Sequence, residues 1–214
     1  LLLAGRSEIE YSYLSLNIGT KTNLNPKALI IPDKNIAVPI KPFSQSLKFI
    51  VDQDIFKDDS LAKPFVIIGG GFAGIEIAFS LRNRWPKRCI QLKIKSVRKL
   101  TKNLVKTIKD LNIEIIRNNP SDSYPRLICT GNQSYEWIKE SGLPVDQKGR
   151  VLTKKTLQVL NYPELFAVGD CGVIKDDSRP SSGVWAVRSA IPLAKSLEAM
   201  SKGLKLNEWK AQRQ

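Results

Sequence analysis

Apolar and polar positions follow two different periods in the middle of the chain, and each period predicts a different element. Residues 65–68 are wholly apolar, which is typical of a strand buried on both faces of a parallel sheet. Glycines follow, and apolar residues then recur at helical spacing over 75–85 until Pro86 halts the helix. The next predicted elements are a strand over 90–95, a helix over 97–111 and a strand over 113–116. This βαβαβ order predicts an α/β fold with a parallel sheet.

The flanking segments predict shorter elements and one long connection. Alternation over 13–19 predicts a short strand that ends in a turn at Gly19. Four prolines between residues 20 and 42 exclude a helix there and favour extended segments that cross between units. The remaining predicted elements are helices over 44–56, 135–141 and 184–199, strands over 126–131 and 165–168, and a turn over 147–149.

Composition then narrows the class of protein. The 214 residues carry a formal net charge of +14, which favours anionic partners such as nucleotides, nucleic acid or an acidic membrane surface. No histidine occurs, which excludes Ser/His/Asp and Cys/His catalysis and most zinc sites. The three cysteines form no CxxC pair and indicate reduced thiols in the cytoplasm, so we expect neither a redox dithiol nor a metal site. The longest apolar stretch is broken by glycines, so we expect no transmembrane segment.

The glycine motif after the first of these strands is the strongest single signal. Residues 69–74 fit G-x-G-x-x-G, with a predicted strand before them and a predicted helix after them. Gly69 allows a sharp turn, Gly71 lets the backbone approach a pyrophosphate, and Gly74 lets the helix pack close to the strand. The helix N-terminus then favours the negative charge of phosphates. A dinucleotide site is favoured over a purely structural turn, although both interpretations stay open. Its candidate residues are Gly69, Gly70, Gly71, Phe72, Ala73 and Gly74.

The end of the second predicted strand indicates which nicotinamide dinucleotide the site prefers. An acid about 20 residues past the last glycine suits NADH, whereas a basic residue suits the 2′-phosphate of NADPH. Lys95 stands at this distance, with Ser96 and Arg98 close behind. NADPH is therefore favoured over NADH, and both stay open because lysine is abundant throughout the chain.

Basic residues are concentrated around this strand. Residues 82–117 contain 12 basic and 2 acidic side chains and supply most of the net charge. Gln91, Lys93 and Lys95 share one face of the strand, which is predicted to meet water.

Further motifs follow in a fixed order. They are residues 66–78, 129–131, 141–143 with Asp146 and Gly149, 157–158 and 165–171, together with 14–19, 39–42, 179–180 and 183–188. This ordered set covers nearly the whole chain and resembles the pyridine nucleotide-disulfide oxidoreductase superfamily of two-Rossmann flavoproteins. Within it, the chain most resembles type II NADH dehydrogenase-like proteins, especially the flavoprotein module fused ahead of selenide, water dikinase.

The resemblance implies a two-Rossmann FAD/NAD(P)-binding architecture of class α/β, with the NAD(P) Rossmann unit present and the FAD half incomplete. It implies FAD and NAD(P)H as cofactors. The glycines of the motif would hold the NAD(P)H pyrophosphate, and Glu76 would lie beside its nicotinamide half. Gly131, in the 129–131 motif, is a further cofactor-binding candidate.

On the flavin side, the resemblance implies three contacts. Asp170 would accept a hydrogen bond from a ribityl hydroxyl of FAD, and the backbone after Gly169 would approach the cofactor. The backbone of Val184 to Val187 would lie near the flavin ring. The alternative for Gly169 and Asp170 is a turn with an N-cap aspartate, and this alternative stays open.

The family pattern assigns 1–44 to the first part of an incomplete FAD-binding domain, 45–131 to the NAD(P)-binding Rossmann domain and 132–214 to the second part of the FAD-binding domain. The first glycine motif, which holds the FAD diphosphate in the family, has no counterpart here. Residues 117–126 stand where the family has a three-stranded antiparallel excursion. Ser189 stands where the family carries glutamine, so quinone reduction is not expected. We expect neither the membrane-anchoring tail of type II dehydrogenases nor a dikinase domain after Gln214, and a missing or fused domain is expected among the partners.

Three functions stay open. The first is an FAD-dependent NAD(P)H oxidoreductase, here a partial or reduced copy, that passes hydride from nicotinamide to flavin and then to an unknown acceptor. No side chain needs to act as a catalytic acid or base in it. The second is a nucleotide-binding remnant without turnover. The third, a basic nucleic-acid-binding module over residues 82–117, is least favoured because no aromatic stacking platform accompanies the charge.

Overall fold

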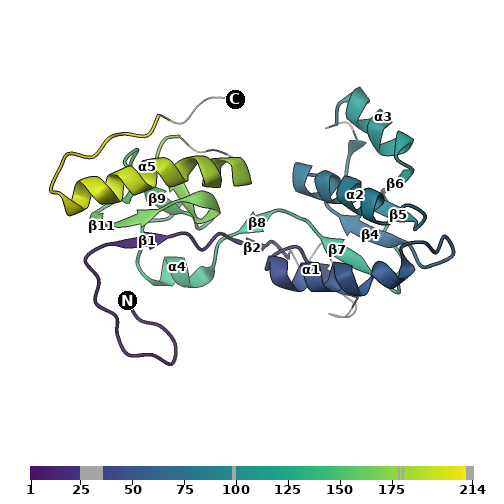
Figure 1. Ribbon diagram of the computed structural model, residues 1–214, viewed down its shortest axis with the longest axis horizontal. Helices are drawn as coiled ribbons and strands as arrows, with labels where there is room; N and C mark the ends of the chain where they lie inside the picture. Colours follow the sequence, from purple (N-terminus) through teal and green to yellow (C-terminus); the bar gives the residue numbers. More distant parts are fainter. Residues whose placement is uncertain (25–35, 98–99, 178, 180, 211–214) are drawn as a thin grey trace. The chain divides into compact units, whose positions relative to one another are not determined.

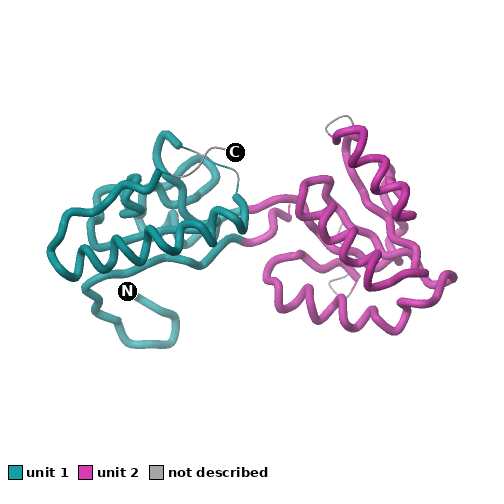
Figure 2. Tube along the Cα trace, turned by 45° about the horizontal axis from the view of Figure 1, so that its top comes forward, with its two compact units in different colours: residues 1–20, 133–214 teal, residues 21–132 magenta. Residues whose placement is uncertain are grey.

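A computed structural model describes residues 1–24, 36–97, 100–177, 179 and 181–210. The chain divides into two compact units (Figure 2). Unit 1 consists of Leu1–Thr20 and Gln133–Gln214, and unit 2 consists of Lys21–Asn132. Within the described residues, no helix is both long enough and apolar enough to cross a membrane.

Unit 2 is built on a five-stranded parallel sheet with the strand order β3-β7-β4-β5-β6 (Figure 1). Its strands are β3 (Ala37–Pro39), β4 (Phe65–Ile68), β5 (Ile90–Lys93), β6 (Ile113–Ile116) and β7 (Arg126–Ile128). The central strand β4 is buried at every position, as its apolar run predicts. Pro39 is tolerated because β3 is an edge strand.

The helices of unit 2 cover one face of this sheet. They are α1 (Phe43–Asp52) with the 3₁₀ turn η1 (Asp54–Phe56), α2 (Phe72–Arg84) and α3 (Lys102–Asp110). Their apolar side chains form a single core with the strands, in which Phe65, Ile67 and Leu92 are fully buried. A smaller cluster around Val66 and Ile128 lies on the opposite face.

Two predicted elements of unit 2 are longer in the sequence analysis than in the structure. The helix predicted over 97–111 begins only at Lys102, because Thr101 Oγ1 caps it by accepting a hydrogen bond from the Leu104 backbone N–H at 3.2 Å; residues 98–99 lie outside the described residues. The strand predicted over 90–95 ends at Lys93. Lys95 is exposed, and Lys93 is half-buried and donates to Asn119 Oδ1, so the face that is predicted to meet water is partly covered at Lys93.

Unit 1 is built on a mixed five-stranded sheet with the order β1-β11-β10-β9-β12. Its strands are β1 (Leu14–Leu16), β9 (Val151–Thr153), β10 (Gln158–Val159), β11 (Tyr162–Ala167) and β12 (Gly172–Ile174). The pairs β1 with β11 and β9 with β12 are parallel, whereas β10 runs antiparallel to both of its neighbours. Helix α4 (Glu136–Glu140) packs on one face through Ile138, and α5 (Gly183–Ser201) packs on the other through Leu193.

The segment between β1 and helix α1 belongs to unit 2 from Lys21 onward. The two connecting segments pair as β2 (Lys21–Thr22) and β8 (Asn132–Gln133), and the Lys41 backbone N–H donates to Thr22 Oγ1 at 2.9 Å. Strand β3 then joins the parallel sheet beside β7. In the described part of 20–42 there is no helix, as the prolines predict, while Pro26 and Pro32 lie outside the described residues.

Candidate functional sites in the two units

The topology of unit 2 marks one position on its sheet. The chain runs from β4 through β5 to β6 on one side, and β7 then pairs on the other side of β4. The carboxyl ends of β4 and β7 therefore lie at the point where the strand order reverses, which is where ligands bind in open parallel sheets. The glycine motif follows β4, and residues 129–131 follow β7.

The glycines of the motif differ in what surrounds them. A Cβ on Gly69, whose φ is +139°, would lie 2.3 Å from the Cys129 carbonyl oxygen, and a Cβ on Gly74 would lie 2.1 Å from the Gly69 carbonyl oxygen. Neither position has room for a side chain, since real Cβ atoms do not approach backbone this closely. A Cβ on Gly71 would meet no heavy atom within 4 Å. The protein itself therefore requires Gly69 and Gly74, whereas the space beside Gly71 is open to a ligand.

The start of helix α2 is open in the same way. Gly71 is the N-cap residue and supplies no side-chain hydrogen bond, and the first turn contains no acidic residue. The first backbone N–H groups of a helix have no partner within the helix, so they are available to an anion. Phe72 and Ala73 are exposed at this end, and Glu76 is exposed one turn further along. Gly70 packs on Ile94, whose Cγ2 would lie 2.5 Å from a Cβ there.

Two lysines lie at the carboxyl end of the neighbouring strand β5, where Lys93 is the last residue of the strand and Lys95 follows it. Lys95 is exposed, and the Lys93 carbonyl accepts a hydrogen bond from the Gly69 backbone N–H at 3.0 Å. Burial lowers the pKa of the Lys93 ammonium, and the nearby charges of Arg126 and Lys95 lower it further. The spacing of about 20 residues from the glycine motif points to Lys95, and it therefore passes over Lys93, where the strand ends. Arg98 lies outside the described residues.

The third strand end at this edge is that of β7. Gly131 is exposed with a φ of +99°, and its carbonyl accepts a hydrogen bond from the Asn23 backbone N–H at 3.0 Å. Burial raises the pKa of the Cys129 thiol to about 12, so this thiol stays protonated and offers no nucleophile.

Unit 1 contains a second glycine turn, which follows β11. Gly169 has a φ of +70° and opens the 3₁₀ turn η3 (Gly169–Cys171), in which Asp170 is half-buried. The Cys171 thiol donates to the Val168 carbonyl oxygen at 3.2 Å and approaches the Leu16 carbonyl oxygen at 3.3 Å, which ties the ends of β11 and β1 to the turn.

Gly172 is a required glycine that sequence analysis missed. A Cβ there would lie 2.6 Å from the Ala167 carbonyl oxygen, so β12 can leave the turn only with glycine at this position. The only available signal was its spacing of three residues from Gly169, which matches the spacing of Gly71 and Gly74.

Helix α5 begins beside this turn. Ser182 caps it by accepting a hydrogen bond from the Val184 backbone N–H at 3.3 Å. A Cβ on Gly169 would lie 3.5 Å from the Ala186 Cβ, so the turn and the first turn of the helix are in contact. Val184, the second residue of the helix, is 50% exposed.

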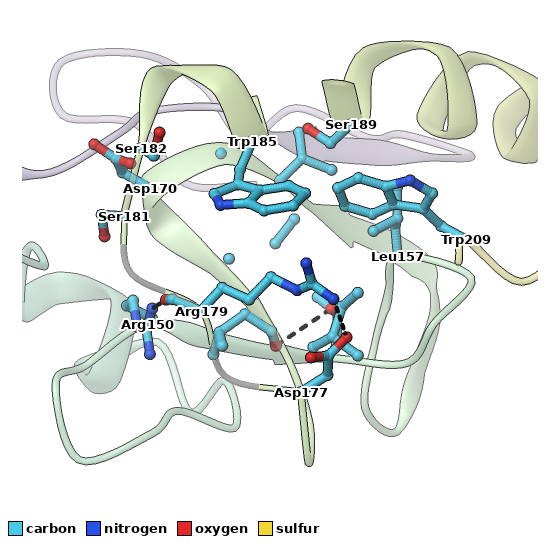
Figure 3. A pocket seen from close by; sticks show the side chains of 17 residues that line it. Arg150, Leu157, Asp170, Asp177, Arg179, Ser181, Ser182, Trp185, Ser189 and Trp209 are labelled. Atoms are coloured by element: carbon cyan, nitrogen blue, oxygen red, sulfur yellow. Dashed lines mark hydrogen bonds and ion pairs between the residues drawn. The ribbon is translucent and has the colours of Figure 1, made fainter. Parts of the chain in front are cut away.

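A small cavity borders Asp170 on the helix side of the sheet (Figure 3). It encloses about 60 Å³, and Trp185 and Trp209 form part of its wall with ring centroids 6.4 Å apart. The Arg179 guanidinium lies 4.5 Å from the Trp185 ring centroid and pairs with Asp177 Oδ2 at 3.0 Å.

A buried arginine, Arg150, lines the cavity and bonds to two neighbouring residues. Arg150 Nη2 lies 2.7 Å from Asp146 Oδ2, and its Nη1 donates to the Arg179 carbonyl oxygen at 2.9 Å. Burial alone would raise the pKa of Asp146, but the hydrogen bonds from Arg150 outweigh it and lower the pKa. In the sequence, Arg179 and Trp185 stand out only as parts of motifs. The cavity could not be predicted, because the residues of its wall come from distant segments. Pro180 lies outside the described residues.

The structure thus separates the predicted site residues into two groups, one in each unit. The group in unit 2 lies at the carboxyl edge of the parallel sheet and at the start of α2, and it contains Gly69, Gly70, Gly71, Phe72, Ala73, Gly74, Glu76, Lys95 and Gly131. The group in unit 1 lies at the η3 turn and the start of α5, and it contains Gly169, Asp170 and Val184.

Comparison with known proteins agrees with this architecture. No family model matches the chain. Among curated proteins, it is 22% identical to "Ferroptosis suppressor protein 1" of Xenopus tropicalis over 82% of the chain and 54% of that protein. It is 25% identical to "Probable NADH dehydrogenase" of Dictyostelium discoideum over 64% of the chain and 39% of that protein. The chain spans about half the length, or less, of these curated relatives.

Solved structures show the same fold. A NAD-dependent persulfide reductase from A. fulgidus superimposes with a TM-score of 0.71 at 16% identity, covering 89% of this chain and 40% of that one. A pyridine nucleotide-disulfide family oxidoreductase from Enterococcus faecalis V583 superimposes with a TM-score of 0.63 at 14% identity, covering 89% and 49%. The α/β architecture expected from the sequence is confirmed, and the chain has the same fold as these two oxidoreductases.

Proposed function

We propose that this chain is part of an FAD-dependent NAD(P)H oxidoreductase, in which unit 2 binds the nicotinamide dinucleotide and unit 1 contacts the flavin. The observation that carries the proposal is the motif in unit 2. A Cβ on Gly69 or Gly74 would lie less than 2.5 Å from backbone oxygen, so both positions require glycine, whereas a Cβ on Gly71, which lies between them, would meet no heavy atom within 4 Å. A turn that served only the fold would not need glycine at an open position with an ordinary φ.

In unit 2, the chain's own residues supply binding and orientation. The backbone at Gly71 and the first N–H groups of α2 hold the pyrophosphate, since they present hydrogen-bond donors and the positive end of the helix dipole. Lys95 and Lys93 stand where the adenosine ribose of a dinucleotide lies in this fold, and their charge favours the 2′-phosphate of NADPH. Glu76 lies beside the nicotinamide half.

In unit 1, the residues fit one part of FAD. The half-buried Asp170 carboxylate stands at the carboxyl end of β11, where it can accept a hydrogen bond from a ribityl hydroxyl, and α5 directs its N-terminus to the same turn. FAD, when bound, supplies the acceptor for the hydride of the nicotinamide. The FAD diphosphate has no matching site, because the sequence contains one G-x-G-x-x-G motif and that motif lies in unit 2. We propose that polypeptide outside these 214 residues supplies it.

A second function, nucleotide binding without turnover, is favoured by the size of the cavity beside Asp170. Its volume of about 60 Å³ is far below the roughly 300 to 1,000 Å³ of pockets that enclose small-molecule cofactors. On this alternative, unit 2 binds the dinucleotide and unit 1 serves the fold. Both functions place the dinucleotide at the same residues, so they differ only in flavin binding.

An absorbance spectrum separates the two functions. The purified protein is measured as isolated, after incubation with excess FAD, and after addition of NADPH or NADH. Flavin bands that bleach on addition of the reduced nicotinamide support the oxidoreductase. NADPH binding without any bound flavin supports the second function when the measured protein includes the polypeptide that is proposed to supply the FAD diphosphate site; in the 214 residues alone, both functions allow this result.

A variant tests the assignment of the dinucleotide to Gly71. Gly71→Glu places a carboxylate in the open position, so we expect NADPH binding to be abolished while the fold is retained. Leu61→Glu introduces the same charge at a residue of unit 2 that is 94% exposed, and it should bind NADPH as the parent chain does. NADPH binding that survives in Gly71→Glu would overturn both functions.

A further inference from the structure

Lys93, the last residue of β5, lies among positive charges. Its half-buried ammonium donates a hydrogen bond to Asn119 Oδ1, in the loop that joins β6 to β7, and within the described residues it takes part in no ion pair. Burial lowers the pKa of this ammonium, and the positive charges of Arg126 and Lys95 lower it further. Lysine is rarely withdrawn from water without a paired charge. Here its partner is a neutral amide, so its charge remains available to an anionic ligand.

The neighbouring cation, Arg126, is already engaged by the loop. Its buried guanidinium donates through Nη2 to the Ser121 carbonyl oxygen, and its Nη1 lies 3.8 Å from Asp122 Oδ1. These contacts anchor the loop two residues after Asn119. Arg126 therefore fixes the segment that carries Asn119 and adds positive charge near Lys93, while these donors are used within the protein.

The hydrogen bond from Lys93 determines what Asn119 offers to a ligand. An amide side chain has an acceptor oxygen and an NH₂ group with two donors. The oxygen is engaged by the ammonium, and within the described residues the NH₂ group donates to no protein atom. Asn119 is also exposed. The two side chains together therefore present N–H donors and a positive charge at the carboxyl end of β5.

We propose that Lys93 and Asn119 form a subsite for the 2′-phosphate of NADPH, to which both side chains donate hydrogen bonds. The subsite rests on the proposed function, which places the adenosine ribose of the dinucleotide at this end of the strand. Donors next to a cation suit a phosphate, because its oxygens are strong acceptors. The ribose diol of NADH is instead recognised by an acidic acceptor, which this pair lacks. Asn119 is thus a specificity residue contributed by the loop between β6 and β7.

The ligands 2′,5′-ADP and 5′-ADP test the subsite, because they differ only in the 2′-phosphate and their binding needs no flavin. Calorimetric titration of the full chain should show 2′,5′-ADP bound about tenfold more tightly than 5′-ADP, the gain expected from hydrogen bonds to a charged group. Equal affinity for the two ligands would overturn the subsite and leave the proposed dinucleotide site in place. If the chain bound neither ligand, the proposed function would fail, and the subsite with it.

Asn119→Asp distinguishes the subsite from the overall charge of unit 2. The new carboxylate pairs with Lys93 and repels a phosphate, so the affinity for 2′,5′-ADP should fall about tenfold while that for 5′-ADP is unchanged. Asn118→Asp introduces the same charge at the adjacent exposed asparagine and should retain the preference for 2′,5′-ADP. The subsite is wrong if Asn119→Asp keeps this preference or if Asn118→Asp loses it to the same extent.

Lys93→Met tests the ammonium separately. Methionine keeps an unbranched apolar side chain at the end of β5 and removes the charge, so the preference for 2′,5′-ADP should disappear. Unchanged affinity for 5′-ADP is the control that the strand and the rest of the site are intact. A variant that still binds 2′,5′-ADP about tenfold more tightly than 5′-ADP would show that Lys93 does not hold the phosphate, and the proposal would be overturned.

Discussion

The glycine turns of the two units begin alike and end differently. In unit 2, Gly69 follows a buried strand and helix α2 starts at Phe72, directly after the turn. In unit 1, Gly169 also follows a buried strand, but β12 comes next and helix α5 starts only at Gly183. The pyrophosphate part of the dinucleotide site proposed in unit 2 is therefore made by consecutive residues, whereas the site proposed in unit 1 is assembled from separate segments.

The difference also concerns what fixes each glycine. Gly69 and Gly74 in unit 2 are required by the close approach of backbone, and Gly69 also by its φ of +139°, whereas Gly169 in unit 1 is required by its backbone conformation alone, since a Cβ there would have its nearest heavy atom at 3.5 Å. Close approach leaves no room for even one carbon atom, while a positive φ permits one at the cost of strain. The two turns should therefore respond differently to the same substitution.

The largest effect is expected for Gly74→Ala. The added Cβ would lie 2.1 Å from the Gly69 carbonyl oxygen, and neither backbone can move without separating α2 from β4. We expect the free energy of unfolding of unit 2 to fall by about 3 kcal/mol, at the upper end of overpacking costs. Hydrogen exchange measured on peptides from β4 and α2 reports this loss for unit 2 alone.

The matched control for Gly74→Ala is Gly71→Ala, three residues earlier in the same turn. Its Cβ meets no heavy atom within 4 Å, so exchange in these peptides should match the parent chain. Equal losses in the two variants would show that the turn as a whole is strained and that Gly71 is not held open for a ligand.

Gly169→Ala in unit 1 should have the intermediate effect. Its Cβ meets the Ala186 Cβ at an ordinary 3.5 Å, but the φ of +70° disfavours any residue with a Cβ. We expect a loss of about 1.5 kcal/mol in unit 1, the cost of one left-handed residue. Exchange in peptides from β11 measures it. A loss as large as that of Gly74→Ala would mean that the turns are constrained in the same way.

The same contrast explains what the sequence could predict. Strands β4 and β6 match the predicted ranges, because a short, largely apolar run between glycine or loop residues is a local signal. Strands β9, β10 and β12 were missed, because each has only two or three residues and exists through pairing with distant partners. Their positions depend on long-range contacts that no local pattern records.

The candidate sites also differ in whether their residues are adjacent in the sequence or are brought together by long-range contacts. The G-x-G-x-x-G motif could be recognised because turn, open position and helix start are adjacent in sequence. The cavity beside Asp170 could not, since Arg150, Arg179, Trp185 and Trp209 are brought together only by the fold. Lys93 was missed for a smaller reason, because the strand ends two residues earlier than the pattern predicts.

Reversing the charge of Lys95 tests whether the carboxyl edge of the sheet in unit 2 recognises the 2′-phosphate of NADPH. In Lys95→Glu, the exposed ammonium after β5 becomes a carboxylate, which repels a phosphate and accepts hydrogen bonds from a ribose diol. We expect the ratio of NADPH to NADH affinity to fall about tenfold, which corresponds to about 1.4 kcal/mol. Titration by nicotinamide fluorescence measures both affinities.

Lys102→Glu is the control for this reversal, because it changes the charge of unit 2 equally at an exposed lysine of α3. It should lower both affinities slightly and leave their ratio unchanged. If both variants change the ratio alike, the preference comes from the overall field of unit 2, and Lys95 has no specific role.

The smallest expected effect is on the stability of unit 1 at acidic pH. The pKa of Asp146 is lowered in the folded state by its hydrogen bonds from Arg150, so this carboxylate stabilises unit 1 above its unfolded pKa of about 3.9, and the stabilisation is lost as pH falls through the lower folded pKa. We expect Asp146→Asn to remove about 1 kcal/mol at pH 7 and progressively less below about pH 4, as measured by urea unfolding.

The pKa of Asp54 in unit 2 is lowered by Arg84 in the same direction. That arginine side chain is 47% exposed, whereas the Arg150 side chain is 7% exposed, so water screens the pair in unit 2 more strongly. Asp54→Asn should therefore cost less at pH 7 than Asp146→Asn, and a larger cost would mean that the hydrogen bond of Trp85 Nε1 to Asp54, and not the ion pair, holds the end of α2.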